Sequence, residues 1–366
     1  MEGGGMTNFT VGPVQMDEDT RRIGSEQIPY FRTQEFSALM RENEALLRAL
    51  FDAPADSRAI FLTGSGTAGM EGGVMNFFTH DDKVLVVNGG SFGHRFAELC
   101  AIHEIPLTEI KLEFGKPLTK EILSQYENLG YTGMLVQLCE TSSGILYDMN
   151  MVGDFCERNG IFLFLDAVSG FLADRLSMKE MHINAAVTGS QKALALPPGM
   201  SFTVLDGTAV SRCEKNRPRS LYFDYQMCLK DGERGQTPFT PAVGTLIQLN
   251  ARLRGIEKSG GISAMNRAAK ERADYFRRRI AHLPLRMFIA PENASNCVTA
   301  LCPARPDVGA HRIFEILKDE HGIWVCPNAG EYADKVFRVG HIGHITQEET
   351  DKLIAAFEDL ARRDIL

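Results

Sequence analysis

The sequence has no apolar run approaching the roughly 18 residues that a membrane-spanning helix needs. It also lacks any cluster of basic residues, and its formal net charge is −8, which argues against a nucleic-acid-binding protein. The start, Met1 to Met6, has neither the basic region nor the apolar segment of a signal peptide. We therefore expect a cytoplasmic protein whose partners include neither a membrane nor a nucleic acid.

The eight cysteines include no C-x-x-C pair and no Cys/His spacing typical of a metal site. We expect reduced, mostly buried thiols, with no bound metal and no disulfide framework. The 366 residues suggest about two domains, and the 44% hydrophobic and 23% charged residues are ordinary for a globular protein.

Buried-strand patterns alternate with helix patterns along the first two thirds of the sequence. The strand patterns are Ala59–Leu62, Lys83–Val87, Met134–Leu138 and Ile161–Leu165. Such alternation is typical of an α/β fold, with a mostly parallel sheet and helices on both of its faces. A helix pattern over Ile262–Leu283 then leads into a smaller set of strands and helices.

We accordingly divide the sequence into three parts. They are an extended N-terminal segment (1–20), a large domain (21–255) and a small C-terminal domain (256–366). The polar stretch Lys215–Pro241 is expected to be irregular, and it is too long for a simple connector, which suggests a functional role. Thr346 and Glu349 have the spacing of a capping box for the last helix.

The strand pattern Ile161–Leu165 ends in Asp166, and Lys192 follows the next short apolar run, Ala185–Val187. An acid at the carboxyl end of a parallel strand lies where open α/β sheets bind ligands. A lysine in apolar surroundings has a lowered pKa and can attack a carbonyl. Together they suggest pyridoxal phosphate (PLP), with the acid on the pyridinium nitrogen and the lysine holding the aldehyde as a Schiff base. Taken alone, however, a strand-end Asp is more often a helix cap or turn residue, and most lysines are solvated surface groups.

Gly64–Gly69 matches the G-x-G-x-x-G pattern and lies between a strand and a helix, so a Rossmann NAD(P) oxidoreductase is a rival interpretation. That fold needs an acid at the end of the second strand, where this sequence has Asn88. A P-loop needs a lysine where Met70 stands. What remains is a turn whose backbone N–H groups hold a phosphate at a helix N-terminus, helped by the hydroxyls of Ser65 and Thr67.

The glycine-rich turn, Asp166 and Ser190-Gln191-Lys192 occur in the order found in class V aminotransferases of PLP fold type I, which this sequence resembles from about Phe9 to Phe357. It is most similar to alanine–glyoxylate and serine–pyruvate transaminases, with 2-aminoethylphosphonate–pyruvate transaminases as near relatives. The resemblance implies a large domain with a mostly parallel central sheet and a smaller C-terminal α+β domain.

The resemblance also implies a role for each residue at a matching position. Residues that would hold the cofactor phosphate are Ser65, Gly66, Thr67, Gln191 and, from a neighbouring subunit, Thr240. Those around the cofactor ring are Phe92 stacking on it, Val168 on its opposite face, Asp166 at its nitrogen and Thr141 near its phenolic oxygen or the substrate. Lys192 would be the Schiff-base lysine and Arg338 would bind the substrate carboxylate.

The implied reaction moves an amino group from a small amino acid of the alanine or serine type to glyoxylate or pyruvate, in a homodimer. Lys192 and Asp166 would be its catalytic residues. A 2-aminoethylphosphonate donor and a PLP lyase of the same fold are the alternatives. The sequence departs from the family pattern at Thr10-Val11-Gly12-Pro13, because the family usually has a proline before this glycine. The departure lies at the substrate end of the expected pocket. His94, His341 and His344 border the motifs, and we interpret them as structural.

Overall fold

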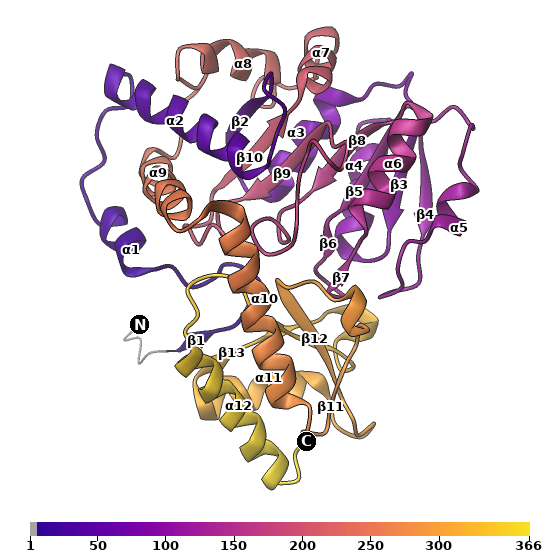
Figure 1. Cartoon of the computed structure of the whole chain (residues 1–366), viewed down its shortest axis with the longest axis vertical. Helices are drawn as coiled ribbons and strands as arrows, with labels where there is room; N and C mark the ends of the chain where they lie inside the picture. The colour runs from indigo at the N-terminus through magenta and orange to yellow at the C-terminus, as the bar shows by residue number, and fades with distance from the viewer. Residues whose placement is uncertain (1–5) are drawn as a thin grey trace.

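A seven-stranded sheet is the centre of the larger part of the molecule in the computed structural model, which describes residues 6–366 (Figure 1). In spatial order its strands are β2 (Arg58–Thr63), β10 (Met200–Leu205), β9 (Ala185–Gly189), β8 (Phe162–Asp166), β5 (Gly133–Gln137), β3 (Val84–Asn88) and β4 (Leu107–Lys111). Only β10 is antiparallel, to both β2 and β9. The prediction of a mostly parallel sheet is therefore confirmed.

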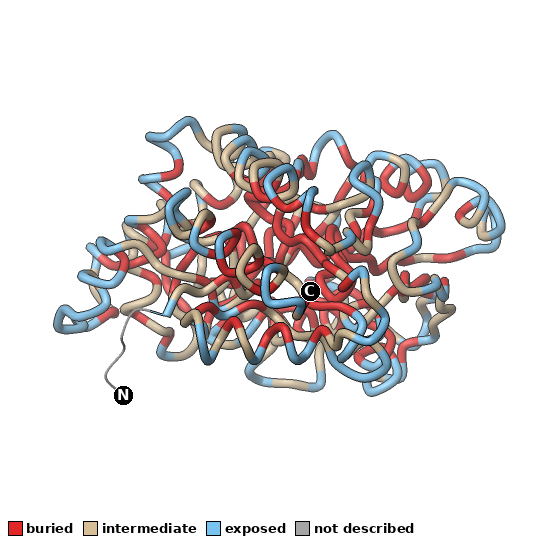
Figure 2. Tube along the Cα trace, turned by 90° about the horizontal axis from the view of Figure 1, so that it is seen from below, coloured by how far each residue is buried: buried red, intermediate tan, exposed pale blue. Residues whose placement is uncertain are grey.

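The two faces of this sheet pack on separate groups of helices, because successive strand residues point to opposite sides. In β8, Phe162 and Phe164 pack on one face, while Leu163 and Leu165 pack on the other. The first face is covered by α3 (Gly66–Phe77), α4 (Ser91–Ile102), α7 (Gly207–Lys215) and α8 (Tyr225–Glu233). The second is covered by α2 (Gln34–Leu50), α5 (Lys120–Ser124), α6 (Met149–Asn159) and α9 (Val243–Lys258). Burial on both faces explains why the inner strands are nearly continuous apolar runs (Figure 2).

The smaller part contains an antiparallel sheet and three helices. The strands, in spatial order, are β11 (Leu285–Met287), β12 (Val298–Pro303), β15 (Phe337–Gly340) and β14 (Cys326–Pro327). The helices are α10 (Gly261–Ile280), which runs down from the larger part (Figure 1), α11 (Ala310–His321) and α12 (Gln347–Arg362). The capping box predicted for the last helix is confirmed, since Thr346 and Glu349 bond reciprocally at the start of α12.

Short elements complete the fold. They are β1 (Thr7–Asn8), paired in parallel with β13 (Ile323–Trp324), α1 (Glu18–Gly24), the pair β6 (Cys139–Glu140) and β7 (Ile145–Leu146), and two 3-10 turns (Pro291–Asn293 and Gly330–Tyr332). No helix within residues 6–366 is long and apolar enough to cross a membrane. In the same range the eight cysteines are free thiols, five of them buried.

The structure differs from the sequence prediction in the stretch Lys215–Pro241, which contains the helix α8. Asp224 caps this helix, and Tyr225 and Leu229 pack into the core. The helix was missed because only these two of its positions are buried, so its apolar face is short. The helix α1 begins inside the segment predicted to be extended, whose first five residues lie outside the described range.

The predicted domain boundary at residue 255 falls in the last turn of α9, which ends at Lys258. The chain then breaks at Gly260, with φ +105°, before α10 begins. The division of the chain into domains stays a prediction.

The helix α3 lies unusually close to the sheet because its inner face is made of glycines. A Cβ atom at Gly73 would lie 2.3 Å from Cζ of Phe164, and one at Gly69 would lie 2.5 Å from Cγ2 of Val187. This close approach fixes the N-terminus of α3 directly beyond the end of β2.

Gly73→Ala is therefore expected to lower the free energy of unfolding by roughly 1–3 kcal/mol, because overpacking against the buried Phe164 ring outweighs the gain of up to about 1 kcal/mol in helix propensity. Gly255→Ala is the matched control, since it lies in α9 with nothing within 4 Å of its added Cβ and should be neutral or stabilising. Urea unfolding of both variants measures the difference. Equal stabilisation by the two substitutions would contradict the close approach.

Candidate active site

The predicted site residues follow the strand ends at one edge of the large sheet. Because β2, β3, β5, β8 and β9 are parallel to one another, their carboxyl ends meet at this edge, where such sheets bind ligands. The residues that follow these strands are Ser65–Thr67 after β2, Phe92 after β3, Thr141 after β5, Asp166–Val168 at and after β8, and Gln191–Lys192 after β9. The topology therefore brings the predicted residues of five separate segments to one edge.

Asp166 is the last residue of β8 and is buried, with 5% of its surface exposed. Burial raises the pKa of this carboxyl group to about 6, and Glu140 adds to the rise. A hydrogen bond of 2.8 Å from the Val168 N–H to Asp166 Oδ1 and the charge of Lys192 act in the opposite direction. Asp166 is thus an acid that a positively charged partner would stabilise in its ionised form.

Lys192 lies in the turn between β9 and β10. Burial lowers the pKa of its amine, while the charge of Asp166 raises it. The lysine side chain lies against Gly12, where a Cβ atom would come within 2.9 Å of Nζ. Only a glycine can approach the amine this closely, so Gly12 forms one wall beside it.

Gly12 belongs to the segment 9–15, which we call the N-terminal strap. On one side, the Val14 N–H donates to the carbonyl of Gln191 at 3.2 Å. On the other, the Phe9 carbonyl accepts from the N–H of Gly340 at 2.7 Å, at the end of β15. The strap therefore connects the lysine turn with the strand that carries Arg338.

The candidate phosphate site is the start of α3. Ser65 is the N-cap residue, and its side chain makes no capping hydrogen bond, so its hydroxyl is available together with the N–H groups of the first turn. A Cβ atom at Gly66 would lie 2.8 Å from Val168 Cγ2, so the turn touches the residue predicted to cover the cofactor ring. In the turn after β9, Oε1 of Gln191 is buried without a hydrogen-bond partner. A half-turn of that amide would put its NH₂ group, a hydrogen-bond donor, where the unpaired oxygen now lies.

Arg338 extends from β15 of the smaller part to this edge of the large sheet. Its Nη1 donates to the Thr141 carbonyl at 3.0 Å, and its Nη2 donates to the Pro327 carbonyl at 2.8 Å. Its Nε is buried without a partner, and its charge acts on the pKa of Lys192. The guanidinium is thus held beside the lysine with an unused donor.

Thr240 lies apart from these residues. It is exposed, in a hollow between the end of β2 and Tyr222. No hydrogen bond within residues 6–366 connects it to the other predicted site residues. Of the neighbouring histidines, His341 is buried at 2.7 Å from Thr299 Oγ1, while His94 lies exposed beside Glu98.

Two residues of the site were missed by the sequence analysis. Glu140 is fully buried, and its Oε2 accepts from the N–H groups of Phe92 and Gly93, both at 3.0 Å, so that it fixes the start of α4. Arg95 lies one turn along α4 and donates from Nη1 to Thr67 Oγ1 at 3.2 Å. The three-residue spacing of Phe92 and Arg95 was the available signal, because it puts both on one helix face.

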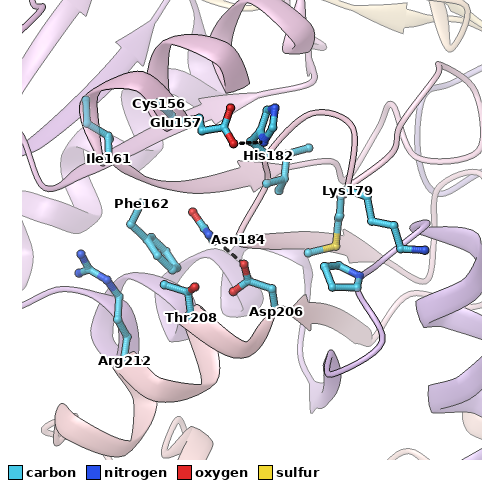
Figure 3. A pocket seen from close by; sticks show the side chains of 14 residues that line it. Cys156, Glu157, Ile161, Phe162, Lys179, His182, Asn184, Asp206, Thr208 and Arg212 are labelled. Carbon is cyan, nitrogen blue, oxygen red and sulfur yellow. Dashed lines mark hydrogen bonds and ion pairs between the residues drawn. The ribbon is translucent and has the colours of Figure 1, made fainter.

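A hollow of about 420 Å³ lies at the opposite edge of the sheet, where β8 and β9 begin (Figure 3). Its polar side chains bond to one another or to neighbours. Asn184 donates to Asp206 at 2.8 Å, and His182 lies 3.0 Å from Glu157. This pairing leaves little for a ligand to bind, so we assign no chemistry to this hollow.

The chain is similar to several known proteins. The chain is 28% identical to the soluble hydrogenase 42 kDa subunit of Anabaena cylindrica, over 89% of this chain and 85% of the relative. It is also 28% identical to a 2-aminoethylphosphonate–pyruvate transaminase of Pseudomonas aeruginosa, over 82% of this chain and 81% of that enzyme. The structure of an alanine–glyoxylate aminotransferase from Nostoc sp. is similar in fold, with a TM-score of 0.92 and 24% identity, covering 98% of this chain and 96% of the other.

The sequence model of one family, aminotransferase class-V, matches residues 29–351. This is most of the chain, and the match includes every predicted site residue. The fold is that of PLP fold type I, as the sequence predicted. The protein belongs to the class V aminotransferases and is a PLP-dependent transaminase.

Proposed function

We propose that the enzyme transfers the amino group of a small amino acid, of the alanine or serine type, to glyoxylate or pyruvate. The observation that carries this proposal is Arg338, a guanidinium beside Lys192 with an unpaired buried donor. A guanidinium binds a carboxylate through two parallel hydrogen bonds. Since donor and acceptor each carry a carboxylate next to the reacting carbon, one arginine serves both half-reactions.

The side chains at the sheet edge fit PLP. The Ser65 hydroxyl, the first N–H groups of α3 and the Gln191 amide would hold the phosphate, and Asp166 would keep the ring nitrogen protonated. Bound PLP supplies an electron sink for the carbon that loses its proton. Lys192 would hold the cofactor covalently and, once displaced by the donor, would move the proton from the donor Cα. Its lowered pKa suits this base role.

A donor with a small side chain is supported by the N-terminal strap. Gly12 comes within van der Waals distance of the amine, so little room is left on that side of the reacting carbon. There are two alternatives: the 2-aminoethylphosphonate donor of the Pseudomonas relative, and an elimination reaction. Assays for amino transfer and for elimination products distinguish a transaminase from an enzyme that catalyses elimination.

The covalent role of Lys192 is the direct test of this function. Borohydride reduction of the PLP-loaded protein followed by peptide mapping is expected to find the pyridoxyl group on Lys192. Lys192→Ala should abolish turnover, whereas the control Lys270→Ala, which removes an exposed lysine paired with Asp274 on α10, should not. A pyridoxyl group on any other lysine would contradict the assignment.

Arg338→Lys tests the substrate class. The change keeps the charge but loses the planar fork, so substrate affinity should fall about ten- to a hundred-fold, as for loss of one hydrogen bond to a charged group, while PLP is still bound. Arg286→Lys is the control, an exposed arginine on β11 of the same sheet.

Single-turnover absorbance measurements of each half-reaction distinguish the donors. Equal losses with the amino donor and with the 2-oxo acid support an alanine- or serine-type donor. A loss with the 2-oxo acid alone favours 2-aminoethylphosphonate, which has no carboxylate. No loss in either half-reaction removes the role of Arg338.

We further propose that the enzyme is a cytoplasmic homodimer in which Thr240 reaches the phosphate site of the partner. Large apolar side chains are exposed near Thr240, with Ile28 57%, Tyr30 71% and Leu221 69% exposed. Arg32 ties the first two to the Thr240 segment by donating to the Thr237 carbonyl at 2.8 Å. A second copy of the chain would cover this surface.

Leu221→Asp should therefore convert the dimer to monomer and weaken PLP binding, because a carboxylate would be buried in the interface. Leu129→Asp is the matched control, with Leu129 51% exposed just before β5, and it should remain dimeric. Analytical ultracentrifugation measures both. A wild-type enzyme that is fully active as a monomer would exclude the shared site.

A further inference from the structure

The residues assigned to the cofactor phosphate include no positively charged side chain. They are Ser65, Gly66, Thr67, Gln191 and the proposed partner residue Thr240. A phosphate monoester carries about 1.5 to 2 negative charges at pH 7. The N-terminus of α3 supplies the equivalent of only about half a positive charge. The assigned set therefore leaves most of the phosphate charge unbalanced.

Arg95 is a cation next to this set. Its Nη1 lies 3.2 Å from Oγ1 of Thr67, in the first turn of α3. It makes no ion pair within residues 6–366, and Glu98, an acid one turn further along α4, lies beside His94 instead. A partly buried guanidinium with a single side-chain hydrogen bond has donors left for an anion.

The position of Arg95 is fixed by its neighbours. Its guanidinium carbon lies 5.0 Å from the centroid of the Phe92 ring, within the range of a cation–π contact. The backbone of Phe92 is in turn held by the buried Glu140. The Arg95 side chain thus extends from the Phe92 ring towards the first turn of α3.

We propose that Arg95 binds the phosphate group of PLP and supplies the positive charge that this site otherwise lacks. The proposal rests on the proposed function, because it requires PLP to bind at this edge. Arg95 and Thr67 would both contact the phosphate, with the guanidinium offering two parallel donors to two of its oxygens. The phosphate would then be held from both α3 and α4.

The test compares PLP with pyridoxal, which has the aldehyde and the ring but no phosphate. Both are titrated against protein freed of cofactor, with binding followed by absorbance and fluorescence. Arg95→Met is expected to weaken PLP binding about ten- to a hundred-fold, the loss for a hydrogen-bonded charge, and to leave pyridoxal binding unchanged. Inorganic phosphate should enhance pyridoxal binding to the wild type and not to the variant, because it occupies the phosphate site beside the ring.

Arg95→Gln is the second variant, because it keeps an N–H donor for Thr67 and removes only the charge. It should show the same selective loss of PLP binding, and it tests the proposal even if Arg95→Met does not fold. Arg158→Met controls for the change in net charge, since Arg158 is exposed on α6 beside Glu127. Unchanged PLP affinity in the Arg95 variants overturns the proposal. Equal losses of affinity for PLP and pyridoxal also overturn it, because they would show that Arg95 supports the ring-binding side chains or the fold. A wild-type protein that binds neither compound instead refutes the proposed function.

Discussion

A carboxyl group buried at the end of β8 is the constraint on which the site depends. Asp166 has a pKa raised to about 6 by burial, against 3.8 for an exposed aspartate. The pKa of Asp166 is higher in the folded than in the unfolded protein, so the folded state favours the protonated carboxyl group. The cofactor-free protein therefore loses stability as the pH rises from about 4 to 6. The loss is about 3 kcal/mol, at about 1.36 kcal/mol for each unit of pKa shift. A protonated ring nitrogen would pair with the carboxylate and offset this loss. The burial that destabilises the cofactor-free protein would therefore also favour a cationic partner for Asp166.

The second constraint is that Lys192 and Arg338 come from different parts of the chain, and in the proposed reaction both would act on one small molecule. The N-terminal strap fixes them from one side, through hydrogen bonds to Gln191 and Gly340. The buried Asp174 adds a second contact between these parts by accepting from Ser295 Oγ and from the Asn296 N–H, just before β12. Because β12 pairs with β15, this contact positions the strand that carries Arg338.

The sequence predicted those features that depend on local pattern. The strands β8 and β9 are apolar runs that each end near a charged residue. The positions of Asp166 and Lys192 at the carboxyl edge of the sheet could therefore be predicted. Features set by contacts between distant residues were not predictable. Glu140 is in a strand-like stretch, and only the fold shows that it holds the backbone of Phe92, 48 residues earlier. The helix α8 was missed because its apolar face is short, and only the fold shows that Tyr225 and Leu229 pack against the sheet.

Membership of the family does not identify the amino donor. The geometry of Arg338 offers an argument about which donors fit. In an α-amino acid the carboxylate is attached to the carbon that loses its proton. In 2-aminoethylphosphonate the acidic group is one carbon further away, about 1.5 Å along the chain. A displacement of about 1 Å can reduce a rate roughly a hundred-fold. Arg338 is held by two backbone carbonyls, from Thr141 and Pro327, so it has little freedom to follow such a shift. An arginine fixed in this way suits acids that share one carboxylate position, and this is the physical argument for the α-amino acid donor that we propose.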